Sequence, residues 1–267
     1  MDDEPEDPRS PRERFLTVFG RIPVMEVLTD SALAVAQVFI ATNVAKPAAR
    51  EIEVLAASRG VPVQRVAPDK VTRISGTGKQ HQGVAADVHA PNRSSLEDWL
   101  ERLAPGTSVT CALLDGITTP ANVGMIIRSA VAAGLDGVVV PSRGVADLGP
   151  LVMKASAGVA FRAPLLRVRT AVEAGQLLRA AGFDLVVLDA DGSTDLWQAA
   201  FGERTAFILG GEHAGVSEEL RQLVTHSVRI PMADGMESLN VAVAASIVFF
   251  DVRRRGADQG IVTVTAD

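Results

Sequence analysis

The second half of the chain alternates short apolar runs with helix-like segments, and this pattern constrains the fold more than any other feature. The apolar runs predict strands at 109–114, 137–140, 184–188, 205–209 and 226–230. The other segments predict helices at 122–133, 150–157, 171–181, 216–223 and 238–254. Nearly continuous apolar strands that alternate with helices are typical of a parallel sheet covered on both faces. The sequence therefore predicts an α/β domain whose ligand binds beyond the carboxyl ends of the strands.

The first half of the chain predicts a smaller α/β unit. Its pattern comprises a helix-like stretch that ends near Leu28, a helix at 47–58, and strands at 35–41, 62–66 and 83–88. Residues 91–107 combine turn residues with the amphipathic segment SLEDWLERL, for which Ser94 or Ser95 is the expected N-cap. We expect the boundary between the two units in this segment.

Composition sets the outer limits of the two units. Residues 1–12 carry charge and proline with almost no apolar side chains, which predicts a disordered acidic tail. The expected organisation is therefore this tail, a domain at 13–90, a linker at 91–107, a domain at 108–256 and a C-terminal tail at 257–267.

Several protein classes are excluded by simple counts. The single cysteine, Cys111, rules out an intramolecular disulfide and a cysteine-built zinc site, and its apolar neighbours predict a buried thiol. No apolar run approaches the ~20 residues of a membrane span. The acidic start MDDEPEDPRSPRER also lacks the basic and apolar segments of a signal peptide. We therefore expect a cytoplasmic protein with no membrane partner.

The net charge of −6 argues at first against a nucleic-acid partner, because phosphate binding relies on clustered Lys and Arg. The distribution of charge weakens that objection. Residues 1–11 hold five acids and one base, residues 12–90 hold ten bases and seven acids, and residues 91–267 are net negative. Of these three segments only 12–90 is positive, and we expect RNA contacts there.

A first chemically suggestive loop lies within LLDGITTPANVGMIIRSAVAAG at 113–134. An apolar strand ends at Asp115, a Gly/Thr/Pro turn follows, and Asn122 occupies the expected N-cap position of the next helix. Arg128 follows among Ile, Ala and Val residues. From this segment alone, Arg128 is either a functional residue or a structural arginine that forms an ion pair or extends to water.

A second loop lies within ILGGEHAGVSEEL at 208–220, where a strand runs into Gly210, Gly211 and Glu212. Paired glycines let a bound group approach the backbone closely, although a tight turn with an exposed glutamate is equally compatible. The spacing is not the GxGxxG of dinucleotide-binding folds. The GTGK at 76–79 is not a phosphate-binding P-loop either, because Arg73 occupies the position of its first glycine.

A third loop lies within RIPMADGMESLNVAVAASIVFF at 229–250. Pro231 stops a strand, and Ser238, Leu239 and Asn240 open a long apolar helix. Ser238 as the N-cap and Asn240 as an early-turn residue is the structural alternative to a functional role.

Together, the three loops resemble in order and spacing the signature motifs of the SpoU (TrmH-type) RNA ribose 2′-O-methyltransferases of the SPOUT superfamily. The resemblance covers about residues 18–254. Within it, GRIPVMEVL at 20–28 and HQGVAADV at 81–88 look like the start and end of the family's RNA-binding domain. The resemblance implies S-adenosyl-L-methionine as cofactor, a trefoil knot in the C-terminal domain, a homodimer and no metal.

The resemblance also implies roles for individual residues. The catalytic region comprises Asn122, Arg128, Glu212, Ser238 and Asn240. The cofactor site comprises Leu209, Gly210, Gly211, Ile230, Met232 and Leu239. The RNA contacts comprise Arg21, Lys79 and His81, of which Arg21 and Lys79 are equally compatible with solvated surface charges.

Chemistry favours Arg128 as the group that binds the target phosphate and stabilises a developing alkoxide. A guanidinium with a pKa above ~12 is a poor general base, which leaves the proton acceptor open. The expected function is 2′-O-methylation of a ribose in RNA, with 23S ribosomal RNA as the expected target in either a housekeeping or an antibiotic-resistance role. The alternatives are a tRNA ribose methyltransferase, a non-catalytic RNA-binding protein on the same fold, and a nucleotide-binding oxidoreductase, which the missing GxGxxG disfavours.

Overall fold

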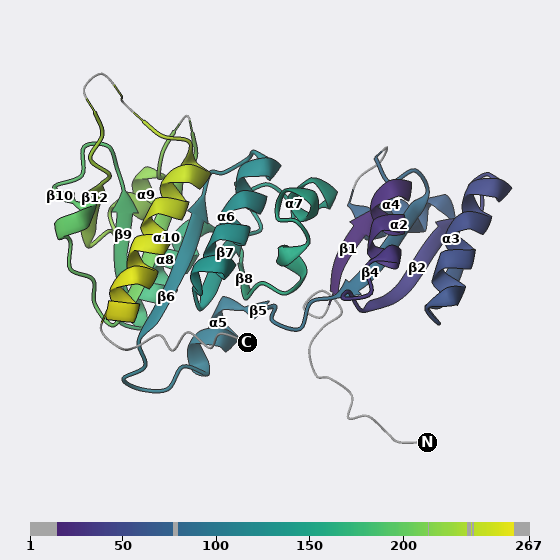
Figure 1. Cartoon of the computed structure of the whole chain (residues 1–267), viewed down its shortest axis with the longest axis horizontal. Helices are drawn as coiled ribbons and strands as arrows, with labels where there is room; N and C mark the ends of the chain where they lie inside the picture. Colours follow the sequence, from purple (N-terminus) through teal and green to yellow (C-terminus); the bar gives the residue numbers. More distant parts are fainter. Residues whose placement is uncertain (1–14, 77–79, 213, 234–235, 237, 259–267) are drawn as a thin grey trace. The chain divides into compact units, whose positions relative to one another are not determined.

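The structure of the protein is a computed structural model that describes residues 15–76, 80–212, 214–233, 236 and 238–258 (Figure 1). The chain divides into two compact units. Unit 1 comprises Met1–Pro91 with Leu148–Pro150, and unit 2 comprises Asn92–Asp147 with Leu151–Asp267. None of the described helices combines the length and the apolar character that a membrane span requires.

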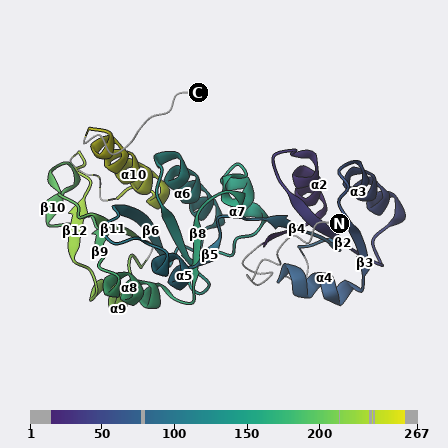
Figure 2. The same cartoon turned by 90° about the horizontal axis from the view of Figure 1, so that it is seen from below.

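Unit 1 is built on a four-stranded sheet with the order β1-β4-β2-β3. Its strands are β1 (Phe15–Phe19), β2 (Val35–Ala41), β3 (Val63–Val66) and β4 (Val84–His89). The β1–β4 and β2–β4 pairs are antiparallel, and β2–β3 is parallel. Helices α2 (Arg21–Thr29) and α3 (Lys46–Ser58) cover one face, and α4 (Pro68–Ser75) covers the other (Figure 2).

Two elements of unit 1 differ from the sequence prediction. The helix-like stretch that ends near Leu28 is a strand followed by a helix. Leu16 and Val18 are buried on one face of the strand, as in a period-2 pattern, and Gly20, at φ 95°, turns the chain between the strand and the helix. Helix α4 was not predicted, since it buries only Val71 and therefore carries little apolar periodicity.

A single arginine ties the end of α3 to the end of α2. The Arg59 guanidinium donates hydrogen bonds to four backbone oxygens, those of Val27, Leu28, Asp30 and Leu33, at 2.7–3.2 Å. The last carbonyls of a helix have no partner within it, so a guanidinium that satisfies several of them fixes how the chain leaves α2.

Unit 2 contains an eight-stranded sheet with the order β10-β12-β9-β11-β6-β7-β8-β5, in which every pair is parallel. The strands are β5 (Ser94–Ser95), β6 (Val109–Asp115), β7 (Gly137–Pro141), β8 (Leu165–Val168), β9 (Asp184–Leu188), β10 (Thr194–Asp195), β11 (Arg204–Gly210) and β12 (His226–Arg229). The predicted parallel α/β sheet is confirmed.

Helices cover both faces of this sheet (Figure 2). One face carries α6 (Pro120–Ala133) and α10 (Val241–Asp258), beside α7 (Pro150–Ala155) and the short turn η1 (Val159–Phe161). The other carries α5 (Leu96–Glu101), α8 (Ala171–Ala180) and α9 (Glu218–Arg221), and η2 (Leu196–Gln198) follows β10. The central strands β6 and β11 are buried on both sides, as their apolar runs predict.

The core of unit 2 contains the only cysteine. Cys111 is fully buried in β6, and burial raises the pKa of its thiol far above the usual range, so it stays protonated. It packs in the apolar cluster that includes Leu178, Phe183 and Leu220, beneath α8 and α9. The predicted buried thiol is confirmed.

Part of the segment predicted as a linker is structured. Strand β5 pairs with β8, and Ser95 caps α5 by accepting a hydrogen bond from the Asp98 N–H at 3.0 Å. The buried side chains of Ser94 and Leu96 attach this segment to the edge of the sheet of unit 2. The predicted tail 1–12 and most of the tail 257–267 lie outside the described residues.

Candidate active site

Three loops that follow parallel strands meet at the carboxyl edge of the sheet in unit 2. They connect β6 to α6, β11 to α9, and β12 to α10. Strands β6 and β11 pair in register from Arg204↔Val109 to Gly210↔Asp115, which brings the first two loops together. This edge is where parallel α/β sheets place their ligands.

A chain of three side chains joins the loops. The Asn240 amide donates to the Asn122 oxygen at 3.1 Å, and the Asn122 amide in turn donates to a carboxylate oxygen of Glu212. Asn122 is only 5% exposed, so its side-chain amide needs hydrogen-bond partners, and Asn240 and Glu212 provide them. The buried amide thereby fixes where the Glu212 carboxylate lies.

The capping roles of Asn122 and Asn240 at the N-termini of α6 and α10 differ from the sequence prediction. The N-cap of α6 is Thr119, and Asn122 lies inside the first turn, because Pro120 already occupies the first helical position. At α10, the N-cap is Asn240 and not Ser238. The Asn240 side-chain oxygen accepts from the N–H groups of Ala242 at 2.9 Å and Val243 at 3.4 Å.

The glycines of the second loop are required by contacts within the protein. A Cβ on Gly211 would lie 2.3 Å from the carbonyl oxygen of Gly116, and a Cβ on Gly210 would lie 2.4 Å from the carbonyl carbon of Gly215. Gly211 and Gly215 also exchange two backbone hydrogen bonds, at 3.1 and 2.9 Å, and Gly215 has φ 65°. Both positions therefore exclude side chains, and the loop that carries Glu212 is closed tightly.

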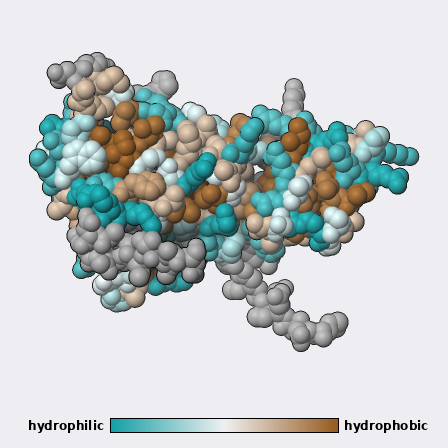
Figure 3. Space-filling model, in the orientation of Figure 1, coloured by the Kyte–Doolittle hydropathy of each residue, from teal (hydrophilic) through white to brown (hydrophobic). Residues whose placement is uncertain are grey.

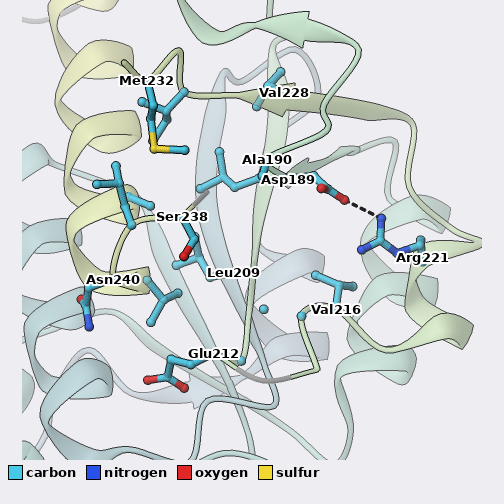
Figure 4. Close-up of a pocket in the computed structure, with 18 residues that line it drawn as sticks. Asp189, Ala190, Leu209, Glu212, Val216, Arg221, Val228, Met232, Ser238 and Asn240 are labelled. Atoms are coloured by element: carbon cyan, nitrogen blue, oxygen red, sulfur yellow. Dashed lines mark hydrogen bonds and ion pairs between the residues drawn. The ribbon is translucent and has the colours of Figure 1, made fainter. Parts of the chain in front are cut away.

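A cleft of about 440 Å³ opens between the second and third loops. It is lined by Leu188, Asp189, Ala190, Leu209, Gly210, Gly211, Glu212, Gly215, Val216, Arg221, Val228, Ile230, Met232, Ser238, Leu239, Asn240, Val241 and Ala244. Glu212 and Asn240 lie toward one side of it, and Asp189 and Arg221 lie toward the other (Figure 4). Its size falls in the range of small-molecule sites, and its walls combine apolar side chains with a few charged and polar ones.

Two family models match the chain, one for each unit. Residues 110–250 match the SpoU rRNA Methylase family, and residues 17–94 match a model described as RNA 2′-O ribose methyltransferase substrate binding. The chain belongs to the SpoU rRNA methylase family. It is therefore an RNA methyltransferase of the SpoU/TrmH kind.

Similar proteins support this membership over nearly the whole chain. An uncharacterized tRNA/rRNA methyltransferase of Mycobacterium avium is 32% identical over 94% of this chain and 81% of its own length. The SpoU methyltransferase AviRb of Streptomyces viridochromogenes, solved with its cofactor AdoMet, has a TM-score of 0.63 and 29% identity over 92% of each chain. An AdoMet-bound rRNA methyltransferase of Sinorhizobium meliloti has a TM-score of 0.61 and 26% identity, covering 91% of this chain and 88% of its own.

Most of the residues predicted for the SpoU site come together in the structure. All six predicted cofactor residues line the cleft, namely Leu209, Gly210, Gly211, Ile230, Met232 and Leu239. Glu212, Ser238 and Asn240 line it as well, and Asn122 lies behind Glu212.

Arg128, a predicted catalytic residue, is not among the residues that line this cleft. It is exposed on α6, six residues from Asn122, which is about 9 Å along the helix axis. Within the described residues, its side chain has neither an ion pair nor a hydrogen bond. Among the described residues Arg128 is thus not part of an ion pair, whereas an arginine that extends to water fits its exposure, and the guanidinium is available to a ligand or a partner.

The predicted RNA contacts of unit 1 are largely engaged elsewhere. His81 is buried: its Nδ1 accepts from the Gly83 N–H at 2.9 Å, so its Nε2 carries the proton and donates to the Thr72 hydroxyl at 3.1 Å. Both ring nitrogens of His81 are therefore engaged within unit 1, and its role in RNA contact stays a prediction. Arg21 forms an ion pair with Glu51 at 2.6 Å, and Lys79 lies outside the described residues.

Sequence reasoning missed one polar pair in the cleft. Arg221 donates to the Asp189 carboxylate at 2.6 Å, and this hydrogen bond holds the pKa of Asp189 below its usual range (Figure 4). Asp189 directly follows β9, so the rule that places ligands at the carboxyl ends of parallel strands would have found it.

Proposed function

We propose that the chain transfers a methyl group from S-adenosyl-L-methionine to a ribose 2′-hydroxyl in RNA, with 23S ribosomal RNA as its target. The observation that carries this proposal is the side-chain series Asn240, Asn122 and Glu212, which ends at the edge of a cleft of ligand size. The ribosomal target is supported by the match to the SpoU rRNA Methylase model.

The residues of the cleft fit this cofactor. Leu209, Ile230 and Met232 supply apolar walls for an adenine ring. Asp189, ionised because Arg221 stabilises its charged form, supplies an acceptor for hydroxyl or ammonium groups. Glu212 supplies a second carboxylate on the side where Asn240 lies. When bound, the cofactor supplies an electrophilic methyl group on a sulfonium sulfur.

The chain contributes positioning to this reaction, because an in-line displacement requires the acceptor oxygen, the methyl carbon and the sulfur to be aligned. Asn122 binds one Glu212 oxygen, and within the described part of the chain the other oxygen has no hydrogen-bond partner and can bind a polar group of the substrate. Arg128 binds the phosphate of the target nucleotide and stabilises the alkoxide that forms as the hydroxyl loses its proton.

A second copy of the chain completes the enzyme in this proposal. On α6, Ala121, Met125, Arg128 and Ala132 form one exposed stripe, and on α10 an adjoining stripe contains Val243, Ile247 and Phe250. Met125 is 40% exposed, Val243 49% and Phe250 48%, and Figure 3 shows hydrophobic surface over α10. Exposed apolar faces of this kind mark protein interfaces, and the small Ala side chains allow close approach.

The reaction is tested by incubating the purified protein with radiolabelled S-adenosyl-L-methionine and unmodified 23S rRNA, with a tRNA pool as the second substrate. A 2′-O-methyl group removes the nucleophile of alkaline RNA cleavage, so the labelled nucleotide will resist alkali if the ribose is methylated. Label in an alkali-sensitive position would contradict ribose methylation, and label in tRNA alone would favour the tRNA alternative.

Two variants test the proposed roles. Arg128→Ala abolishes methyl transfer and leaves cofactor affinity nearly unchanged, whereas equal loss of both would indicate a structural arginine. The pair Val243→Glu and Phe250→Glu converts the dimer to a monomer in sedimentation experiments, because like charges then face each other across a two-fold interface. A monomeric wild-type protein would exclude the dimer.

A further inference from the structure

We propose that Arg143 and Arg169 form a phosphate-contact site on unit 2, which holds the RNA backbone beside the cleft. The proposal rests on the RNA methyltransferase function above and adds a contact surface to it. It places two cations at the same edge of the sheet as the cleft, in a chain whose overall charge is negative.

The sequence around these two arginines is locally basic. Between Asp136 and Glu173 the chain contains five basic residues, Arg143, Lys154, Arg162, Arg167 and Arg169, and a single acidic one, Asp147. The net charge of residues 91–267 is negative, so it does not reveal this basic segment. Such local clusters, and not the net charge, determine phosphate binding.

The fold brings Arg143 and Arg169 to the same place. Strands β7 and β8 are parallel neighbours that pair at Pro141↔Val168, and each arginine follows within two residues of that pair. The backbone ladder continues one step further, because the Ser142 N–H donates to the Val168 oxygen at 2.9 Å. The Ser142 hydroxyl also donates to the Arg169 oxygen at 3.3 Å. The two loops therefore leave the sheet side by side.

Both guanidinium groups are exposed and uncommitted within the part of the chain that the structure describes. Neither forms an ion pair or a side-chain hydrogen bond, even though Asp147 and Glu173 are near in sequence. Two other exposed arginines are neutralised, Arg21 by Glu51 and Arg229 by Asp195, both at 2.6 Å. Free guanidinium groups suit phosphate because each presents two parallel N–H donors to its oxygens.

The position of this pair suits a strand of RNA that enters the cleft. Strand β7 lies two positions and β8 three positions from β11, so at about 4.8 Å per strand the arginines begin roughly 10–14 Å from the Glu212 loop. The N-termini of α6 and α8 also lie at this edge of the sheet, and helix N-termini favour anions. An RNA backbone that runs along the edge would meet both arginines before its target nucleotide reaches Glu212.

The test compares two charge-neutral variants. The double variant Arg143→Gln with Arg169→Gln removes the proposed site, and Arg162→Gln is the matched control. Arg162 is exposed, with no ion pair among the described residues, but it precedes β8 and so lies at the opposite edge of the sheet. Binding of fluorescently labelled oligo(U) is measured by anisotropy across a salt series, together with thermal stability and cofactor affinity.

We expect the double variant to lower the slope of log K against log salt by about 1–2 units, because each lost phosphate contact removes about one unit. Arg162→Gln leaves the slope unchanged, and Arg143→Lys with Arg169→Lys restores most of it. An unchanged slope in the double variant, an equal loss in the control, or salt-independent binding by the wild type would overturn the proposal.

The outcome is separable from that of the proposed function. If the wild type binds oligo(U) through these arginines but methylates neither rRNA nor tRNA, the contact site stands and the catalytic assignment fails. If the double variant methylates rRNA with an unchanged KM for RNA, the catalytic assignment stands and the contact site is overturned.

Discussion

The side-chain amide of Asn122 donates a hydrogen bond to the carboxylate of Glu212, across 90 positions of the chain. A third residue, Asn240, holds the Asn122 oxygen, so the orientation of the buried amide is determined from both ends. The carboxylate at the cleft is thus positioned by residues that need not touch a ligand.

This arrangement predicts that capping and positioning by Asn240 are separable. Asn240→Ala removes the cap of α10 and lowers the free energy of unfolding by about 1 kcal/mol. Asn240→Asp keeps the cap but presents only acceptor oxygens to Asn122, so stability is nearly retained and methyl transfer falls steeply. Urea denaturation and transfer rates measured on both variants check this, and full activity in Asn240→Asp would contradict the positioning role.

Gly211 is predicted to tolerate no side chain. In Gly211→Ala, the new Cβ meets the Gly116 oxygen and the loop must move, which costs about 2 kcal/mol or more and weakens cofactor binding. The matched control is Gly202→Ala, where the Cβ meets only the mobile end of the Asp184 side chain. Thermal unfolding and calorimetric titration with S-adenosyl-L-methionine measure both effects. Equal stability of the two variants would refute the close-approach argument.

Arg59 is predicted to be a principal stabilising residue of unit 1. Arg59→Met leaves four backbone oxygens without their guanidinium donor and costs about 2–3 kcal/mol, since hydrogen bonds from charged donors are stronger than neutral ones. Arg50→Met, an exposed arginine on the same helix, is the control. Hydrogen exchange of the amides in α2 and β2 reports on unit 1 alone, and equal protection in both variants would contradict the prediction.

Asp136 is predicted to give the protein a pH dependence of its own. Partial burial of the Asp136 carboxyl raises its pKa, and the hydrogen bond it accepts from the Thr110 N–H at 2.8 Å opposes that rise only in part. The folded state therefore holds the proton more tightly than the unfolded state. Stability is lost as pH rises from the ordinary aspartate value of 3.8 through the raised folded value.

Asp136→Asn keeps an acceptor for the Thr110 N–H and removes the loss of stability that accompanies ionisation of Asp136. The stability of the variant relative to wild type should increase with pH across that window and then stay constant. Urea titrations between pH 3 and pH 7 measure the difference, and a difference independent of pH would show that the carboxyl is not perturbed.

Much of the fold and site follows from local sequence pattern. The strands β6, β9 and β11 are long, apolar and buried on both sides, and they were predicted within a residue or two of their observed bounds. Most of the predicted cofactor residues lie at or just after the ends of β11 and β12. Three short strands, β5, β8 and β10, form because neighbouring strands supply hydrogen-bond partners. The periodicity of apolar residues in these segments does not predict them.

Other features depend on contacts between distant residues. Only the packed structure reveals that Asn122 is buried beside Glu212, or that both ring nitrogens of His81 are occupied. The same holds for Gly211, whose need for a glycine comes from the Gly116 backbone and not from a ligand. The homodimer and the trefoil knot stay predictions.

The hydrogen bond from Asn240 to Asn122 also bears on the order in which the protein folds. It spans 118 positions, and Asn240 directly precedes the last described helix of the chain, α10. Contacts of such sequence separation form slowly, because the entropy of closing a long loop must be met first. A nascent or partly folded chain can assemble the strands of the sheet while its Glu212 remains unplaced. We therefore expect the Glu212 site to be completed last, when α10 docks against α6 and brings Asn240 to Asn122.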